Sequence, residues 1–240
     1  MCAATWTRAA LAAAFSLIAG DALADCRNLS FEDTRYTVCE AQPGDTIRTY
    51  LDAGDGQKIG TFERLKAEAE GRIVFAMNAG MYHADRSPVG LYIENGQKVR
   101  DVVRRKGPGN FGMLPNGVLC VKDGAARVMA TDAWTDTLGC DFATQSGPML
   151  VIDGKLHPRF IDGSTSTYVR NGVGILPDGR LVAAISNDPV NFHDFARLFR
   201  DGLGVRNALF LDGNISRLYA PAIGRADLGF PLGPMLAVTR

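Results

Sequence analysis

The residues best suited to chemistry stand where apolar stretches end in a polar side chain beside a glycine. The run Leu209-Phe210-Leu211-Asp212-Gly213 ends a strand-like segment with a carboxylate. A carboxylate anchored at a strand end can face a cleft, and fixed carboxylates are the usual means of breaking sugar linkages. Three other runs share this arrangement: Asn78-Ala79-Gly80, Gln145-Ser146-Gly147-Pro148 and Arg170-Asn171-Gly172. We therefore treat these four strand ends as one candidate site.

The three histidines, His83, His157 and His193, offer little to a metal ion. None is spaced as a metal-binding pair, and the sequence predicts no metal and no cofactor. His157 and His193 are expected to be surface or packing residues. His83 follows the Asn78 run and has Asp85 close by, so it is a candidate for lining the site.

Common catalytic and nucleotide-binding motifs are absent or misplaced. Residues 107–112 match the dinucleotide pattern Gly-x-Gly-x-x-Gly, but Pro108 lies inside the run and a hairpin is expected after it. There is no Gly-x-x-x-x-Gly-Lys-Ser/Thr loop. Ser146 lacks the Gly-x-Ser-x-Gly elbow of many esterases, which disfavours a serine hydrolase.

Two helices are expected to precede two of the candidate strand ends. Thr61 to Glu70 and Asn191 to Asp201 each place apolar residues on one face, with Thr61 and Asn191 as N-caps. Each helix leads through a glycine to an apolar strand, Ile73–Met77 or Ala208–Leu211. The strands end in Asn78 and in Asp212.

Glycine turns between apolar runs predict many antiparallel hairpins from Val89 to Ser186, because Asn-Gly and Asp-Gly accept positive φ. The expected turns are Glu94-Asn95-Gly96, Pro115-Asn116-Gly117, Lys122-Asp123-Gly124, Ile152-Asp153-Gly154 and Pro177-Asp178-Gly179. The predicted fold class is α+β, with mixed, mainly antiparallel sheets and a few packed helices.

Two internal similarities suggest two related lobes around one cleft. In the first, residues of the two helix–strand units align without gaps: Phe62, Arg64, Leu65, Gly71 and Gly80 with Phe195, Arg197, Leu198, Gly204 and Gly213. In the second, the run Gly112–Leu119 resembles Gly174–Leu181. Both similarities consist of residue types that are common in cores and turns.

The first 24 residues are expected to be a signal peptide, with Arg8 before the apolar stretch Ala9–Ala19. Ala22-Leu23-Ala24 predicts cleavage before Asp25, and the apolar stretch is too short to span a bilayer. Cys26 raises lipidation as a less favoured alternative. The expected location is therefore beyond the inner membrane, periplasmic or extracellular, in a bacterium, and no membrane-spanning segment is expected in the rest of the chain.

Four cysteines follow the signal segment, and an even number in an oxidising compartment favours two disulfides. Of the three possible pairings, we favour the nearest neighbours, Cys26–Cys39 and Cys120–Cys140. A zinc site and free structural thiols are the alternatives.

The predicted organisation after the signal is an N-terminal extension, residues 25–57, packed on a domain of residues 58–240. Formal charge is balanced, with 26 basic and 26 acidic residues, and the densest basic run is Arg104-Arg105-Lys106. This balance argues against a nucleic-acid partner. The sequence leaves the oligomeric state open.

The ordered motif runs resemble a known family, the phosphodiester glycosidases, which include N-acetylglucosamine-1-phosphodiester alpha-N-acetylglucosaminidase and bacterial secreted relatives. The resemblance covers about Gly71 to Tyr219. The runs that carry it are Asn78-Ala79-Gly80-Met81-Tyr82, Ser146-Gly147-Pro148, Arg170-Asn171-Gly172-Val173-Gly174-Ile175 and Leu211-Asp212-Gly213.

The resemblance implies a secreted hydrolase that breaks the C1–oxygen bond of a sugar-1-phosphodiester. Phosphate leaves without a strong acid, so the site needs a carboxylate and an anion clamp. Asp212 is the expected carboxylate and Arg170 the expected clamp. Asn78 and Ser146 are expected to orient sugar hydroxyls or phosphate oxygens. The other expected substrate contacts are Gly80, Tyr82, His83, Asp85, Gly147 and Gly213.

Two other functions remain open. The chain departs from the family pattern at Asn214-Ile215, beside the expected carboxylate. This departure favours a non-catalytic module that binds envelope glycans or phosphate-bearing polymers. A secreted esterase that uses Ser146 is the third hypothesis.

Overall fold

Antiparallel sheets dominate the computed structural model of the chain, which describes residue 1, residues 25–212 and residues 215–240. The described strands form three sheets, and each pair of neighbouring strands is antiparallel. The first sheet has the order β1 (Cys26–Phe31), β2 (Thr34–Glu40), β13 (Leu181–Ser186), β12 (Asn171–Ile175), β14 (Ala208–Phe210), β10 (Met149–Ile152) and β11 (Lys155–Leu156).

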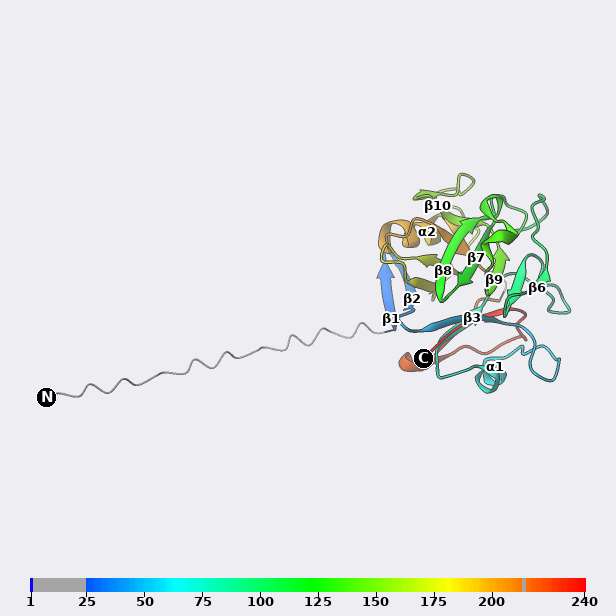
Figure 1. Ribbon diagram of the computed structural model, residues 1–240. Coiled ribbons are helices and arrows are strands. Elements are labelled where there is room, and N and C mark those ends of the chain that lie inside the picture. The colour runs from blue at the N-terminus through cyan, green and yellow to red at the C-terminus, as the bar shows by residue number, and fades with distance from the viewer. Residues whose placement is uncertain (2–24, 213–214) are drawn as a thin grey trace.

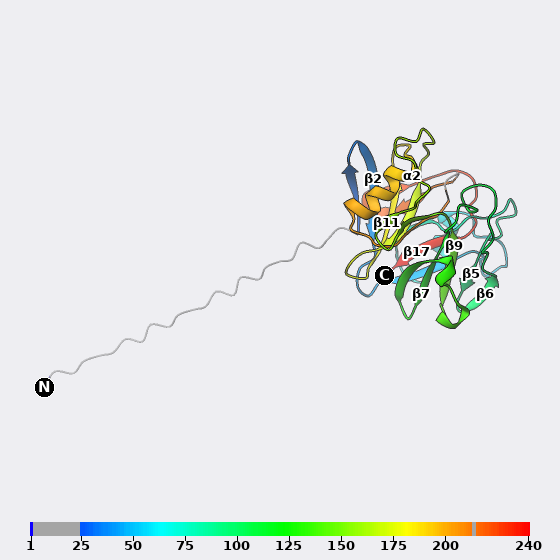
Figure 2. The same cartoon turned by 90° about the horizontal axis from the view of Figure 1, so that it is seen from above.

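The other two sheets have five strands each. The second sheet has the order β16 (Arg225–Ala226), β15 (Leu218–Ala220), β4 (Ile73–Asn78), β17 (Met235–Thr239) and β3 (Thr46–Tyr50). The third has the order β6 (Gln97–Arg100), β5 (Tyr92–Glu94), β9 (Phe142–Ser146), β7 (Gly117–Lys122) and β8 (Ala125–Ala130). The third sheet lies across the molecule from helix α2, as two views show (Figures 1 and 2).

The helices are short, and both α-helices begin at the expected caps. They are α1 (Phe62–Glu68) and α2 (Phe192–Arg197), the latter continued by a π-helical turn over Leu198–Gly202. The Thr61 and Asn191 side chains accept from backbone N–H groups three residues later, which confirms both predicted N-caps. The 3-10 turns are Thr131–Ala133, Asp136–Leu138 and Pro221–Ile223. No described helix has the length and apolar character needed to cross a bilayer.

One central core lies between the three sheets. Alternate residues of the central strands point into it, as in β13, where Leu181, Ala183 and Ile185 face the core. The next residues along the strand, Val182 and Ala184, face α2 instead. On the second sheet the outer face is covered by α1. The outer faces of the first two sheets are therefore each covered by one helix.

Both predicted disulfides are present. Cys26 and Cys39 lie directly opposite each other on β1 and β2, and Cys120 of β7 bonds Cys140 just before β9. Closing loops of this length stabilises a fold by about 3 kcal/mol each in the chain-entropy estimate.

The predicted hairpin at Pro115-Asn116-Gly117 is wrong. Gly117 is the first residue of β7, where it pairs with Ser146 and Ala130. A side chain at Gly117 would collide with Met149, so glycine is needed there for close packing rather than for a turn. The resemblance of Gly112–Leu119 to the true β12–β13 hairpin therefore does not extend to structure. The other four predicted turns join β5–β6, β7–β8, β10–β11 and β12–β13.

The fold-class prediction is right about the antiparallel sheets but overstates the helices, since within residues 25–212 and 215–240 only two short α-helices pack on them. The two-lobe arrangement and the domain boundaries stay predictions. Residues 26–50 supply strands to two sheets, because β2 pairs with β13 and β3 pairs with β17. The predicted signal peptide, residues 1–24, lies outside the described residues except for Met1.

Candidate active site

At the start of β12, two neighbouring side chains lie on opposite faces of the sheet. Extended residues alternate in direction, so Arg170, directly before β12, lies on the face covered by α2, and Asn171, the first residue of β12, lies on the other. The Asn171 amide donates to the side-chain oxygen of Asn78, at 3.0 Å, and to its backbone oxygen, at 3.2 Å. The ends of β4 and β12 are thereby joined, although they belong to different sheets.

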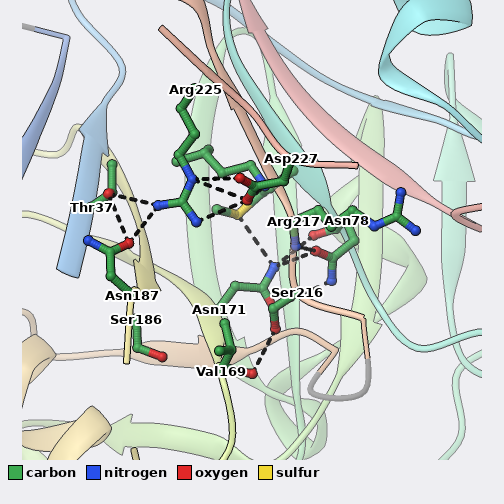
Figure 3. A network of polar contacts seen from close by, with 12 residues as sticks. Thr37, Asn78, Val169, Asn171, Ser186, Asn187, Ser216, Arg217, Arg225 and Asp227 are labelled. Carbon is green, nitrogen blue, oxygen red and sulfur yellow. Dashed lines mark hydrogen bonds and ion pairs between the residues drawn. The ribbon is translucent and has the colours of Figure 1, made fainter. Parts of the chain in front are cut away.

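Asn78 also holds the segment that follows Asp212. Its Oδ1 accepts from the backbone N–H of Arg217, at 2.9 Å. The Ser216 hydroxyl lies within hydrogen-bond distance of three acceptors, the backbone oxygens of Asp212 (2.8 Å) and Val169 (3.1 Å) and Oδ1 of Asn171 (3.3 Å). Figure 3 shows Asn78, Asn171 and Ser216 gathered beside the Arg217 backbone.

Ser146 secures the strand before Asp212. It is fully buried at the end of β9, and its hydroxyl donates to the backbone oxygen of Leu211 at 2.6 Å. The Leu211 N–H in turn donates to the backbone oxygen of Asn171. The four predicted motif runs therefore converge, and Ser146 acts through the backbone rather than as an accessible nucleophile. This burial argues against the esterase hypothesis.

Asp212 is partly buried and lies two residues after the end of β14. Burial is the main cause that raises the pKa of the Tyr82 phenol to about 12, and the Asp212 charge raises it further. The Arg217 charge acts in the opposite direction. Asp212, Tyr82 and Arg217 are thus electrostatic neighbours, and Tyr82 is a neutral phenol at physiological pH. Its hydroxyl donates to the backbone oxygen of Pro231 at 3.4 Å.

The side chain of Arg170, the predicted anion clamp, is engaged within the protein. The residue is 1% exposed, and its guanidinium lies 3.6 Å above the ring of Phe192. Its Nε donates to the Val190 oxygen at 2.8 Å and its Nη2 to the Ser166 oxygen at 3.0 Å. Burial lowers the pKa of this guanidinium to about 10. A direct contact with substrate would require residues 161–170 to move.

Two predicted ligand-facing glycines are needed for packing. A side chain at Gly80 would collide with the backbone oxygen of Gln145, and the Gly80 N–H already donates to Thr144 at 3.1 Å. A Cβ at Gly147 would lie 2.5 Å from that of Asn116. These glycines bring strand ends together, and their role as substrate contacts stays a prediction.

His83 and Asp85 lie on an exposed turn closed by a bridge between Tyr82 and Pro88. The Asp85 carboxylate accepts from the Ser87 hydroxyl (2.6 Å) and N–H (2.9 Å), and these bonds lower its pKa. Both of these hydrogen bonds are local to the turn. The roles of His83 and Asp85 as substrate contacts stay predictions.

The remaining predicted residues near Asp212, Gly213 and Asn214, lie outside the described residues. Sequence reasoning missed Asn171 and Arg217. Asn171 stands inside a quoted motif run, so its place beside Arg170 was a usable signal. No pattern in the sequence marks Arg217.

One group of side chains could hold a metal ion among the described residues. Ligand atoms of Asp162, His193 and Asp194 lie within 4.8 Å of one another. Asp194 also accepts from the Asn191 side chain at 2.8 Å. His193 and Asp194 belong to the first turn of α2, and no described hydrogen bond joins the group to the Asn78–Asn171 contacts.

A second polar cluster supports the segment after β15. Asp227 pairs with Arg225 at 2.9 Å and accepts from the N–H of Leu218. Arg225 also donates to Thr37 on β2 (2.8 Å) and to Asn187 (2.6 Å), which ties this segment to the first sheet (Figure 3).

The fold is shared with solved structures of low sequence identity. One is the zebrafish N-acetylglucosamine-1-phosphodiester alpha-N-acetylglucosaminidase catalytic domain, auto-inhibited by its pro-peptide, at TM-score 0.64 and 13% identity over 90% of this chain and 81% of that one. Another is a putative exported protein from Burkholderia pseudomallei K96243, at TM-score 0.59 and 10% identity over 86% and 74%.

A family model named phosphodiester glycosidase matches residues 71–227. The chain is also 36% identical, over 196 residues, to the uncharacterized protein YigE of Escherichia coli (strain K12), covering 81% of this chain and 77% of that protein. The chain belongs to the phosphodiester glycosidase family, as the motif runs predicted.

Proposed function

We propose that this protein is a hydrolase that cleaves the sugar C1–oxygen bond of a sugar-1-phosphodiester. Family membership and the zebrafish fold relative support this reaction class. The observation that carries the proposal is the convergence of the motif runs on Asp212, through Asn78–Asn171, Ser146–Leu211 and Ser216–Asp212 contacts.

Asp212 supplies the carboxylate, either by stabilising the positive charge that develops at C1 or by assisting the attacking group. In the overall reaction, a bond from C1 to the oxygen of water forms and the bond from C1 to the phosphate oxygen breaks. The bonding electrons leave with the phosphate, which becomes a phosphomonoester, and the water proton passes to the carboxylate or to solvent.

Asn78 and Ser146 serve this reaction as positioning residues, since their side chains bind backbone atoms on either side of Asp212. Arg170 stays a candidate clamp, but in that role it must first leave the ring of Phe192.

The experiment is turnover of a panel of sugar-1-phosphodiesters by the purified, disulfide-bonded protein, read as release of free sugar and phosphomonoester. Asp212→Asn should lower kcat/KM by at least about 100-fold. Asp123→Asn, in the β7–β8 turn, is the matched carboxylate control and should be unchanged. Equal turnover by Asp212→Asn and wild type would overturn the mechanism. Binding without turnover would favour the glycan- or polymer-binding alternative.

We also propose that the protein is exported, with cleavage before Asp25 and a periplasmic or extracellular location. The two disulfides support this, since such bonds persist in oxidising compartments. N-terminal sequencing of protein from the periplasmic fraction should begin at Asp25. A retained N-terminus in the cytoplasmic fraction would refute export.

A further inference from the structure

A cavity of about 280 Å³ lies between α1 and residues 226–229. Arg217, directly before β15, and Tyr219, in β15, are two residues apart, so both fall on the face covered by α1, and both line this cavity. Phe62 and Lys66 of α1 form another part of its wall. The cavity lies next to the candidate site, because the charges of Arg217 and Asp212 both act on the Tyr82 phenol.

Arg217 is a buried cation with unused hydrogen-bonding capacity. The residue is 7% exposed, and its Nη2 has no hydrogen-bond partner among the described residues. Such a donor is costly to bury unless something accepts from it. Burial lowers the pKa of this guanidinium, as expected for a cation drawn out of water.

The acidic residues of the cavity wall each pair with another cation. The Glu63 carboxylate lies 3.0 Å from Nζ of Lys66, and Asp227 pairs with Arg225 at 2.9 Å. The Asp227 charge also acts on the Arg217 guanidinium, but no described group accepts a hydrogen bond from its Nη2, and an anion at that atom would do so.

Glycine at residue 229 lets the backbone pass close to the Arg217 guanidinium without a side chain between them. A Cβ there would lie 3.1 Å from Cζ of Arg217, and Gly229 has φ +147°, a conformation that side-chain-bearing residues avoid. On either side of Gly229 stand two large exposed apolar side chains, Leu228 at 94% and Phe230 at 79% exposure. An apolar surface thus flanks the buried cation.

We propose that this cavity binds a phosphate group that carries an apolar substituent, with Arg217 on the phosphate and Leu228 and Phe230 on the substituent. A guanidinium binds two phosphate oxygens at once. Covering exposed apolar side chains with an alkyl group lowers the free energy, because apolar surface is removed from water. The proposal rests on the proposed function and deepens it, because it names the chemical class on the leaving-group side of the substrate.

The test is calorimetric binding of methyl phosphate and octyl phosphate to the full folded protein. Octyl phosphate should bind at least about fivefold more tightly than methyl phosphate. Arg217→Gln should weaken both ligands by at least about tenfold. The double variant Leu228→Ser/Phe230→Ser should abolish the preference for octyl phosphate and leave methyl phosphate unchanged. Arg35→Gln, which removes an exposed cation paired with Asp188, is the matched control.

Gly229→Ala provides a second test that keeps the arginine. Its new methyl group would press on the guanidinium, so it should weaken methyl phosphate binding by at least about threefold. Equal binding by wild type and Arg217→Gln would overturn the proposal, as would an octyl preference that survives loss of both apolar side chains.

Failure of this proposal can be told apart from failure of the proposed function. Binding is measured without turnover, so Arg217-dependent phosphate binding can persist in a protein whose hydrolysis does not depend on Asp212. Conversely, Asp212-dependent hydrolysis with Arg217-independent binding would refute only the phosphate site.

Discussion

The faces covered by α1 and α2 each bury one arginine, and the two differ in what surrounds the guanidinium. Under α2, Arg170 meets two backbone oxygens and an aromatic ring. Under α1, Arg217 keeps a donor without a partner and borders a cavity. A buried cation that donates to backbone oxygens and stacks on a ring holds the fold together, whereas one with an unpartnered Nη2 beside a cavity is available to a ligand. Burial alone therefore does not assign a role to an arginine.

The largest expected effect on stability comes from Arg170→Ala. Two carbonyls lose their donors and Phe192 loses its cation, so the free energy of unfolding should fall by about 3 kcal/mol. Urea unfolding measures it. Arg197→Ala, which removes partly exposed ion pairs to Glu32 and Asp201, should cost less than about 1 kcal/mol. A stable Arg170→Ala protein that lost only substrate affinity would instead restore Arg170 as the clamp.

The next largest loss of stability is expected for Asn171→Ala, at the junction between the two faces. Removing the amide breaks its bonds to Asn78 and should lower the free energy of unfolding by about 2 kcal/mol. Asn28→Ala, on β1, removes one bond to Thr37 and should cost about 0.5 kcal/mol. Equal losses in the two variants would mean that the strand-end junction contributes no special stability.

Arg217→Gln should change the free energy of unfolding by less than about 1 kcal/mol. The variant gives up a desolvated charge and keeps the backbone N–H that donates to Asn78, so its costs and gains nearly offset each other. Urea unfolding of this variant, under the conditions used for Arg170→Ala, measures the change. A loss as large as that of Arg170→Ala would make the two arginines equivalent and remove the contrast drawn above.

The smallest effect should be seen in the titration of the Tyr82 phenol, which NMR of labelled tyrosine can measure. Its pKa is raised from 10.0 to about 12, so its proton stabilises the fold below about pH 10, and this contribution is lost as pH rises toward 12. Asp212→Asn should lower the pKa of Tyr82, and Arg217→Gln should raise it further. Arg170→Lys should leave it in place, and a shift there would contradict the separation of the two faces.

Local patterns were enough to predict the helices, their caps, the disulfides and four hairpins, because each depends on residues close in sequence. The candidate site was predictable only as a set of strand ends. The contacts within the site depend on how the three sheets meet, and no local pattern encodes that arrangement. Examples are the hydrogen bonds from Asn171 to Asn78 and from Ser146 to Leu211. Strand alternation would have placed Arg170 and Asn171 on opposite faces of the sheet if the sequence had shown where β12 begins. Gly117 misled because a glycine needed for close packing looks the same in sequence as one needed for a turn.

The order of the second sheet bears on how the protein is made. Strand β17, residues 235–239, lies between β4 and β3, yet it follows every other described strand in the sequence. During synthesis, β3 and β4 must wait with unpaired edges until the ribosome has released those residues. Asn78, at the end of β4, pairs with Met235, so its strand pairing is completed only when β17 joins the sheet. A chain cut short before Met235 would leave facing edges of β3 and β4 unpaired and would be prone to aggregation.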